Sequence, residues 1–118
     1  MHKPSTRKMS EAHEEYIARV LGGRRTRNSG AVWSDQMDVR NDVRDDLYAF
    51  AADGKSTFGE SIGVSKAMWQ KAVEQSNDLI PCLPLRFYGT YRLDVDLDLW
   101  VIDGETFEML LEIARDNG

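Results

Sequence analysis

Two ionisable side chains stand two positions apart where an apolar run of the sequence ends. Asp53 and Lys55 follow the run from Leu47 to Ala52, and Asp38 lies upstream of it. In a strand, residues i and i+2 point to the same face, so Asp53 and Lys55 are expected to project together. Two carboxylates beside an ammonium group are suited to metal-dependent chemistry on phosphodiesters. These residue types therefore predict a phosphodiester-cleaving site.

The expected metal is Mg²⁺, which prefers oxygen ligands and keeps several of its waters. Asp38 and Asp53 can supply carboxylates, and Gly54 between the paired residues can supply a backbone carbonyl. Lys55 would then orient the attacking water or stabilise the charged transition state. A third carboxylate is expected from the first helix, at Glu14 or a neighbour.

The same pair of residues also has an ordinary structural interpretation. An isolated Asp-x-Lys is most often a surface ion pair. Here the apolar run comes directly before the pair, and Ser56-Thr57 comes directly after it. This context favours a strand end that lines a cleft.

Charge is distributed unevenly along the chain. The net charge is −5, yet residues 1–27 carry seven basic and three acidic groups, a local +4, whereas residues 28–118 carry eight basic and seventeen acidic groups, a local −9. A phosphate backbone is attracted to a basic segment of this kind. For Lys3, Arg7 and Lys8, a solvated and partly disordered tail is an equally good interpretation.

The composition excludes several protein classes. With 118 residues, 42% hydrophobic and 30% charged, the chain is typical of one folded domain. No apolar run is long enough to cross a bilayer, and the polar start lacks the apolar core of a secretory signal, so a cytoplasmic protein is expected. Cys82 can form no internal disulfide, and together with His2 and His13 it does not make a structural zinc site.

The elements that must position these residues are indicated by hydrophobic periodicity and turn residues. We expect a helix capped by Ser10 and ended by Gly22-Gly23, a strand or hairpin within 31–40, a strand over 47–52, a helix from Ser65 to about Asn77, a strand from Leu83 or Pro84 to Tyr88, a strand over 93–101, and a helix capped by Asp103. The order αβββαββα indicates an α/β fold with a mixed β-sheet flanked by helices. Residues 1–9 are expected to form a flexible basic tail, and residues 10–118 a single domain.

Five segments resemble the PD-(D/E)xK nuclease superfamily, and within it the small Holliday-junction resolvases of archaea and phages. In chain order, between about Ser10 and Tyr88, they read EEYIARVLGGRRTRNSGA, SDQMDVR, AFAADGKST, SIGVSKAMWQKAVEQ and PCLPLRFYG. The resemblance implies a restriction-endonuclease-like fold. It matches Glu14 to the helix glutamate of that family, Asp38 to its first aspartate, and Asp53 and Lys55 to its (D/E)xK pair.

The resemblance also implies a function. It predicts an endonuclease that uses Mg²⁺, for which Mn²⁺ can substitute, and that resolves branched DNA by paired phosphodiester cleavage during recombination or repair in a prokaryotic or phage-infected cell. Two symmetric cuts need two active sites, so a homodimer is expected. The implied metal ligands are Glu14, Asp38, Asp53 and the Gly54 carbonyl. The implied DNA-contacting residues are Arg24, Arg25, Arg27, Asn28 and Ser29.

The chain departs from the commoner family pattern at two places. Asp53 stands where glutamate is more usual, and the tripeptide that begins at Asp35 stands where small or basic residues are more usual. The second departure leaves Asp35 as a competitor for the metal. Glu11 and Glu15 likewise compete with Glu14, because helix register is uncertain by a few residues.

Two other signals have simpler interpretations than chemistry. Asp94, Asp96 and Asp98 are spaced as in a calcium loop, but Leu99 stands where that loop needs glycine, so a strand with one solvated acidic face is expected. His13 is next to a candidate ligand, yet a lone helix histidine is more often a surface residue than a general base.

Two alternative functions stay open. The same site could act on flaps, single strands or general duplex, or the chain could be a non-catalytic DNA-binding or partner module. Trp69 and Trp100 are expected in the core or at a subunit interface, and Trp33 in the core or at the DNA surface. Met68, Trp69 and the last helix are candidates for the dimer contact.

Overall fold

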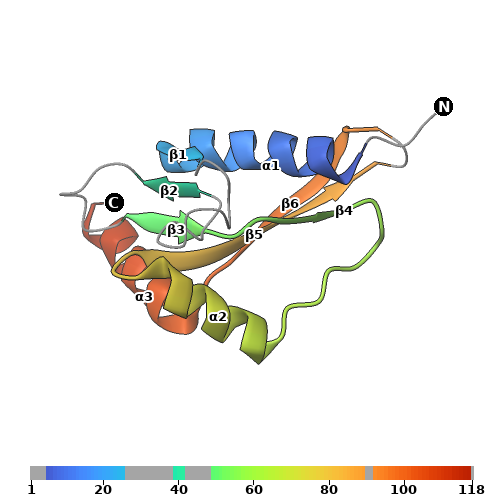
Figure 1. The fold of residues 1–118 in the computed structure, drawn as a ribbon. Coiled ribbons are helices and arrows are strands. Elements are labelled where there is room, and N and C mark those ends of the chain that lie inside the picture. The colour runs from blue at the N-terminus through green and yellow to red at the C-terminus, as the bar shows by residue number, and fades with distance from the viewer. Residues whose placement is uncertain (1–4, 26–38, 42–48, 90–91, 118) are drawn as a thin grey trace.

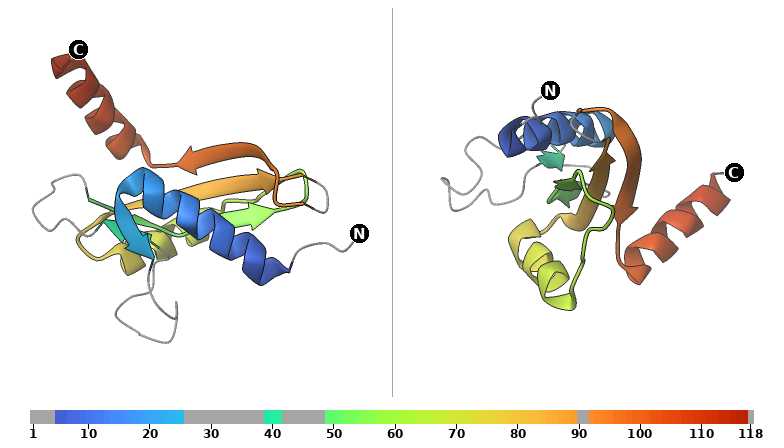
Figure 2. Two further views of the ribbon diagram at one scale, coloured as in Figure 1. Left: turned by 90° about the horizontal axis from the view of Figure 1, so that it is seen from above. Right: turned by 90° about the vertical axis from the view of Figure 1, so that its right-hand side faces the viewer.

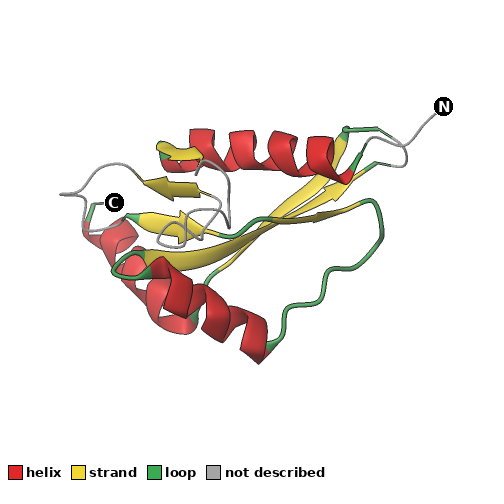
Figure 3. Cartoon of the chain, viewed as in Figure 1, coloured by secondary structure: helices red, strands yellow, loops and turns green. Residues whose placement is uncertain are grey.

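The computed structural model describes residues 5–25, 39–41, 49–89 and 92–117. Its elements are α1 (Thr6–Leu21), β1 (Gly23–Arg25), β2 (Val39–Asn41), β3 (Phe50–Ala52), β4 (Lys55–Thr57), α2 (Lys66–Ser76), β5 (Ile80–Tyr88), β6 (Val95–Val101) and α3 (Gly104–Asp116). A mixed sheet lies between helices, so the expected α/β class is confirmed (Figures 1 and 3). The order contains one strand more than expected: β3 is interrupted and resumes as β4, and β1 lies before the range 31–40 in which the first strand or hairpin was expected.

Strand β5 is the centre of the sheet. β3 and β4 run parallel to it on one side, β6 runs antiparallel on the other, and β2 and β1 continue the sheet beyond β3. β5 begins at Ile80, earlier than the expected start at Leu83 or Pro84. Pro81 is tolerated there because its nitrogen points to the β6 side, where pairing begins only at Leu83.

β3 and β4 form one strand with a two-residue break at Asp53-Gly54. Every pair with β5 is thirty positions apart, from Phe50 with Ile80 to Thr57 with Phe87. The constant offset means that no residue is inserted at the break. The two short strands therefore keep the register of a single parallel strand.

A proline on β5 accounts for this break. Along this side, β5 donates from alternate amides, beginning with that of Ile80, which donates to the Ala49 carbonyl at 2.9 Å. The next donors in the series are Cys82 and Pro84, and proline has no amide hydrogen. The ladder bond from β5 to the carbonyl of Asp53 is therefore missing, although the Asp53 amide still donates to the Cys82 carbonyl.

The two faces of the sheet carry separate apolar clusters. On the face covered by α1, the buried side chains are Ile17, Ala52 and Cys82. On the face covered by α2, they are Ala51, Ala72 and Leu83. Because the neighbours Ala51 and Ala52 belong to different clusters, β3 is covered on both faces, as its continuous apolar run predicts.

Helix α1 begins earlier than the sequence pattern predicts. Ser5, not Ser10, is its N-cap, and its hydroxyl accepts a hydrogen bond from the Lys8 amide at 3.2 Å. Met9 is buried, and its carbonyl accepts a hydrogen bond from the Tyr88 hydroxyl at 2.9 Å. Residues 6–9, which we expected in a basic tail, are thus part of the helix that covers the sheet.

The other two helix starts are confirmed. Ser65 accepts from the Met68 amide at 3.1 Å, and Asp103 accepts from the Thr106 amide at 2.9 Å. Trp69 and Trp100 pack half-buried against the α2 and α1 clusters, so their expected core positions are confirmed too. None of the helices described is long and apolar enough to cross a membrane.

The C-terminal part of the fold differs from expectation. The leucines of β6 were expected to face a core, but Leu97 and Leu99 are 48% and 44% exposed. Helix α3 projects away from the sheet and does not pack beside α1 or α2 (Figure 2). The apolar alternation of β6 thus predicts the strand correctly but not its burial.

Candidate active site at the break between β3 and β4

A cavity of ≈ 250 Å³ opens where α1 passes over the break between β3 and β4. α1 contributes Glu14, and the break contributes Asp53 and Lys55. The complete lining is Ser10, His13, Glu14, Asp53, Gly54, Lys55 and Ser56. Three of the four predicted catalytic side chains therefore line one cavity, although they come from separate parts of the sequence.

Asp53 and Lys55 project together, as their spacing predicts. The Lys55 Nζ lies 3.2 Å from the Asp53 Oδ2, and the two side chains are 37% and 26% exposed, respectively. The amide of Asp53 donates to the Cys82 carbonyl at 3.1 Å, which fixes the backbone at this point. The pair is thus held at the sheet while its charged ends reach the cavity.

The structure distinguishes the three candidate helix glutamates. Glu14 lines the cavity. Glu11 pairs with Arg7 at 3.1 Å on the exposed side of the helix, and Glu15 is also exposed and is not part of the lining. The placement favours Glu14 over both competitors.

Gly54 allows the helix to come close to the break. A Cβ atom built on this glycine would lie 2.8 Å from the Ile17 Cδ1 and 3.1 Å from the His13 Nδ1. Real Cβ contacts are not as short as 2.8 Å and are seldom as short as 3.1 Å, so a side chain here would require the Ile17 and His13 side chains to shift. The glycine between the paired charges therefore allows the tight packing of these side chains, independently of its carbonyl.

His13 is buried, contrary to the surface position we expected. It is 2% exposed, and its Nε2 has no hydrogen-bond partner. Burial, with a further contribution from the nearby positive charge of Arg86, lowers the pKa of His13 to about 4. At neutral pH, the cavity wall therefore contains an uncharged imidazole.

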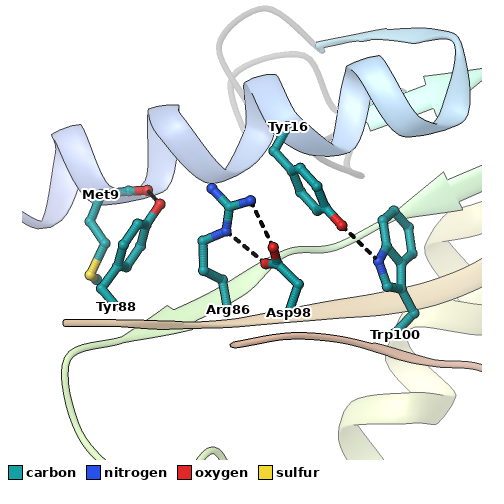
Figure 4. Close-up of polar contacts among 6 residues, drawn as sticks. All are labelled: Met9, Tyr16, Arg86, Tyr88, Asp98 and Trp100. Carbon is teal, nitrogen blue, oxygen red and sulfur yellow. Dashed lines mark hydrogen bonds and ion pairs between the residues drawn. The ribbon is translucent and has the colours of Figure 1, made fainter. Parts of the chain in front are cut away.

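A group of polar side chains lies between α1 and the β5–β6 pair beside the cavity (Figure 4). Arg86 makes two hydrogen bonds to Asp98, at 2.7 and 3.0 Å, and its guanidinium carbon lies 4.2 Å from the ring centroid of Tyr16. The Trp100 indole donates to the Tyr16 hydroxyl at 3.3 Å. Asp98 is therefore not part of a solvated acidic face, whereas Asp94 and Asp96 are exposed as expected.

Sequence reasoning missed this group because it depends on strand register. Arg86 faces Asp98 only once β5 and β6 are aligned. The one available signal was an arginine inside an apolar strand, which needs a partner if it is buried. Burial raises the pKa of Cys82 to about 12, and its side chain packs with Ile17 and Ala52 in the core.

Several predicted site residues fall outside the described part of the chain. These are Asp38 and its competitor Asp35, together with Arg27, Asn28, Ser29 and Trp33. Arg24 and Arg25 lie in β1. Val39, the first described residue of β2, pairs with Ala52, the residue before Asp53.

The donor set fits a hard cation with few protein ligands. Within the described ranges, no three His, Cys, Asp or Glu residues are grouped closely enough to hold a metal. Glu14 and Asp53 supply two carboxylates, which is the number that Mg²⁺ commonly takes from a protein while keeping waters.

Comparison of the chain with protein-family models, with curated proteins and with solved structures finds no match.

Proposed function

We propose that this chain is a Mg²⁺-dependent endodeoxyribonuclease that resolves branched DNA by paired phosphodiester cleavage, built on the PD-(D/E)xK plan in a restriction-endonuclease-like fold. One observation carries the proposal. Glu14 from α1 lines the same cavity as Asp53 and Lys55 from the break in the sheet. A surface ion pair would not need a helix carboxylate beside it.

Each side chain has a distinct role in this proposal. Glu14 and Asp53, with Asp38 from the sequence pattern, hold the metal together with the Gly54 carbonyl. When bound, Mg²⁺ neutralises charge on the scissile phosphate and makes a bound water more acidic. Lys55 is placed by its 3.2 Å contact with Asp53 to donate a hydrogen bond to the attacking water or to the phosphate.

The buried imidazole of His13 and the close approach of α1 to Gly54 define one wall of this site. His13 forms part of the wall under α1, and Ile17 packs behind it. Because the His13 imidazole is uncharged at neutral pH, it adds no positive charge to compete with a metal for the carboxylates.

DNA binding is assigned to the basic segment that follows α1. Arg24 and Arg25 lie in β1, directly after the helix that carries Glu14, and Arg27, Asn28 and Ser29 complete the segment by the sequence pattern. Phosphate contacts of this kind recognise shape more than base sequence, and their affinity falls steeply with salt.

The test is cleavage of a synthetic four-way junction, compared at equal concentration with a flap, a linear duplex and a single strand. Wild-type protein with Mg²⁺ should cut the junction with paired nicks, and EDTA should stop the reaction. Glu14→Gln and Asp53→Asn should each lower the rate of cleavage by about 10³-fold, whereas the exposed controls Glu15→Gln and Asp78→Asn should leave it unchanged.

The possible outcomes separate the alternatives. Preferential cleavage of flaps or duplex would assign the site to a general nuclease of the same kind. Metal-independent binding without any cleavage, lost only on substitution of Arg24 and Arg25, would assign the chain to DNA binding alone. Undiminished cleavage by Asp53→Asn would remove the site from the mechanism.

A further inference from the structure

Two apolar surfaces stay exposed among the residues that the structure describes, and each belongs to a different kind of element. Strand β6 exposes Val95, Leu97 and Leu99 on one face, at 45%, 48% and 44%. Helix α3 exposes Phe107 and Leu111, at 58% and 37%. Contiguous exposed apolar side chains of this size are unusual on a monomer and mark an interaction surface.

The two surfaces do not cover each other within one chain. α3 follows β6 after only Ile102 and Asp103, yet it leads away from the sheet, and both views in Figure 2 show it projecting from the body of the molecule. Its first turn is anchored, since Thr106 is buried, but Phe107 is not covered by the described part of the chain. A helix of 13 residues is marginal in water without tertiary packing.

The charge of α3 argues against two classes of partner. Its polar side carries Glu105, Glu108, Glu112 and Asp116, with Arg115 as the one base of the helix. A DNA backbone would be repelled by this helix, and so would an anionic membrane surface. The partner must therefore supply an apolar surface without adding negative charge opposite these side chains.

A second copy of the same chain meets this requirement. We propose the interface of the homodimer expected from the sequence: two-fold symmetric, with α3 of each protomer packing its Phe107–Leu111 side on the β6 leucine face of the other. In a two-fold interface, each chain offers both surfaces once, so both are covered together. A helix stripe on an open sheet face is also a regular way to bury apolar residues.

The exposed area agrees with a dimer of ordinary size. The apolar side chains named above, together with Leu93, expose on the order of 500 Å² per chain. A standard interface buries about 800 Å² per partner, of which roughly two thirds is apolar in homodimers. The uncovered surface thus has about the extent that such an interface uses.

The first test is the oligomeric state over a series of concentrations, measured by light scattering after size exclusion. Wild type is expected at twice the 13.4 kDa mass of the chain. Leu97→Gln with Leu99→Gln, and separately Phe107→Gln, should each weaken dimerisation by at least 100-fold, whereas Glu108→Gln on the polar side of α3 should not. Circular dichroism and thermal unfolding check that the variants remain folded.

The second test separates exchange of α3 between chains from packing within one chain. Protein carrying Leu97→Cys is mixed with protein carrying Phe107→Cys, and a short bismaleimide is added. Cys82 is 1% exposed and stays unreactive. A covalent product containing both variants supports the proposal.

Other results would overturn it. These are a monomeric wild type, a dimer unaffected by both sets of substitutions, or a cross-link formed only inside a chain that carries both cysteines. The proposal does not depend on nuclease activity, since none of these measurements involves DNA or metal.

Discussion

The strand pair β5–β6 has two faces of opposite composition. Under α1, Arg86 and Tyr88 are buried at 6% and 2% exposure, while on the other face Leu97 and Leu99 stay nearly half exposed. Polar side chains can be buried when each has a partner, as Arg86 has in Asp98 and Tyr88 has in the Met9 carbonyl. Burial here follows partners more closely than polarity, and the exposed leucines form the surface that we propose a second copy of the chain covers.

The largest expected effect concerns chemistry on the α1 side alone. Asp53→Asn removes a charged metal ligand and should lower the rate of junction cleavage by about 10³-fold, equivalent to about 4 kcal/mol in the barrier. Urea unfolding should change little, because Asp53 is partly exposed. Leu99→Gln on the opposite face serves as the contrast. If it reduced the rate per active site as much as Asp53→Asn, the two faces would not be functionally distinct.

The next effect concerns stability under α1. Arg86→Met leaves the Asp98 carboxylate beside the helix without its partner and should lower the free energy of unfolding by about 3 kcal/mol. The neighbouring exposed Asp96→Asn should change it by less than about 0.5 kcal/mol. Urea denaturation of the three proteins measures both values. Equal effects of the two substitutions would mean that the buried pair contributes no more than a surface charge.

A pH-dependent effect on stability tests the burial of His13 on the α1 side of the sheet. The pKa of His13 is about 4 in the folded protein, against 6.5 for an ordinary histidine, so between these values the unfolded state binds the extra proton. Stability should therefore rise as pH increases from about 4 to about 6.5, by on the order of 2–3 kcal/mol, and level off above. His13→Gln should lack this rise in urea unfolding across pH. An identical slope in variant and wild type would contradict the burial of this imidazole.

The smallest effect tests how the start of α1 is attached. Tyr88→Phe removes the hydroxyl that donates to the Met9 carbonyl and should cost about 1 kcal/mol of unfolding free energy. Hydrogen exchange should show faster opening of the first turns of α1, with the last turns unchanged. Faster exchange along the whole helix would show that α1 opens as one unit.

The parts of the fold that local chemistry determines could be predicted from the sequence. Ser65 and Asp103 cap their helices as expected, and the two-residue spacing of Asp53 and Lys55 put both side chains on one side. Ser5 displaced Ser10 as the first cap because Met9 gains burial against Tyr88, a contact from the far end of the chain. Local pattern contains no information of that kind.

The parts that depend on long-range pairing could not be predicted. Arg86 meets Asp98 only through the β5–β6 register, and His13 is buried only because α1 crosses Gly54 closely. The same alternation that predicts β6 gives no indication that its leucines lack a cover. For the site, the sequence pattern named Glu14 among three glutamates, and the helix position separated it from the other two.

Pro84 has a consequence beyond the pairing pattern. Its missing hydrogen is a covalent property, so no rearrangement of side chains can restore the bond, and the opening beside Asp53 persists wherever β5 keeps this alignment. Pro84→Ala would offer the absent donor and join β3 to β4, adding one backbone hydrogen bond, which contributes about 1 kcal/mol of stability. The variant would be more stable, with β3 and β4 joined into one continuous strand beside the site.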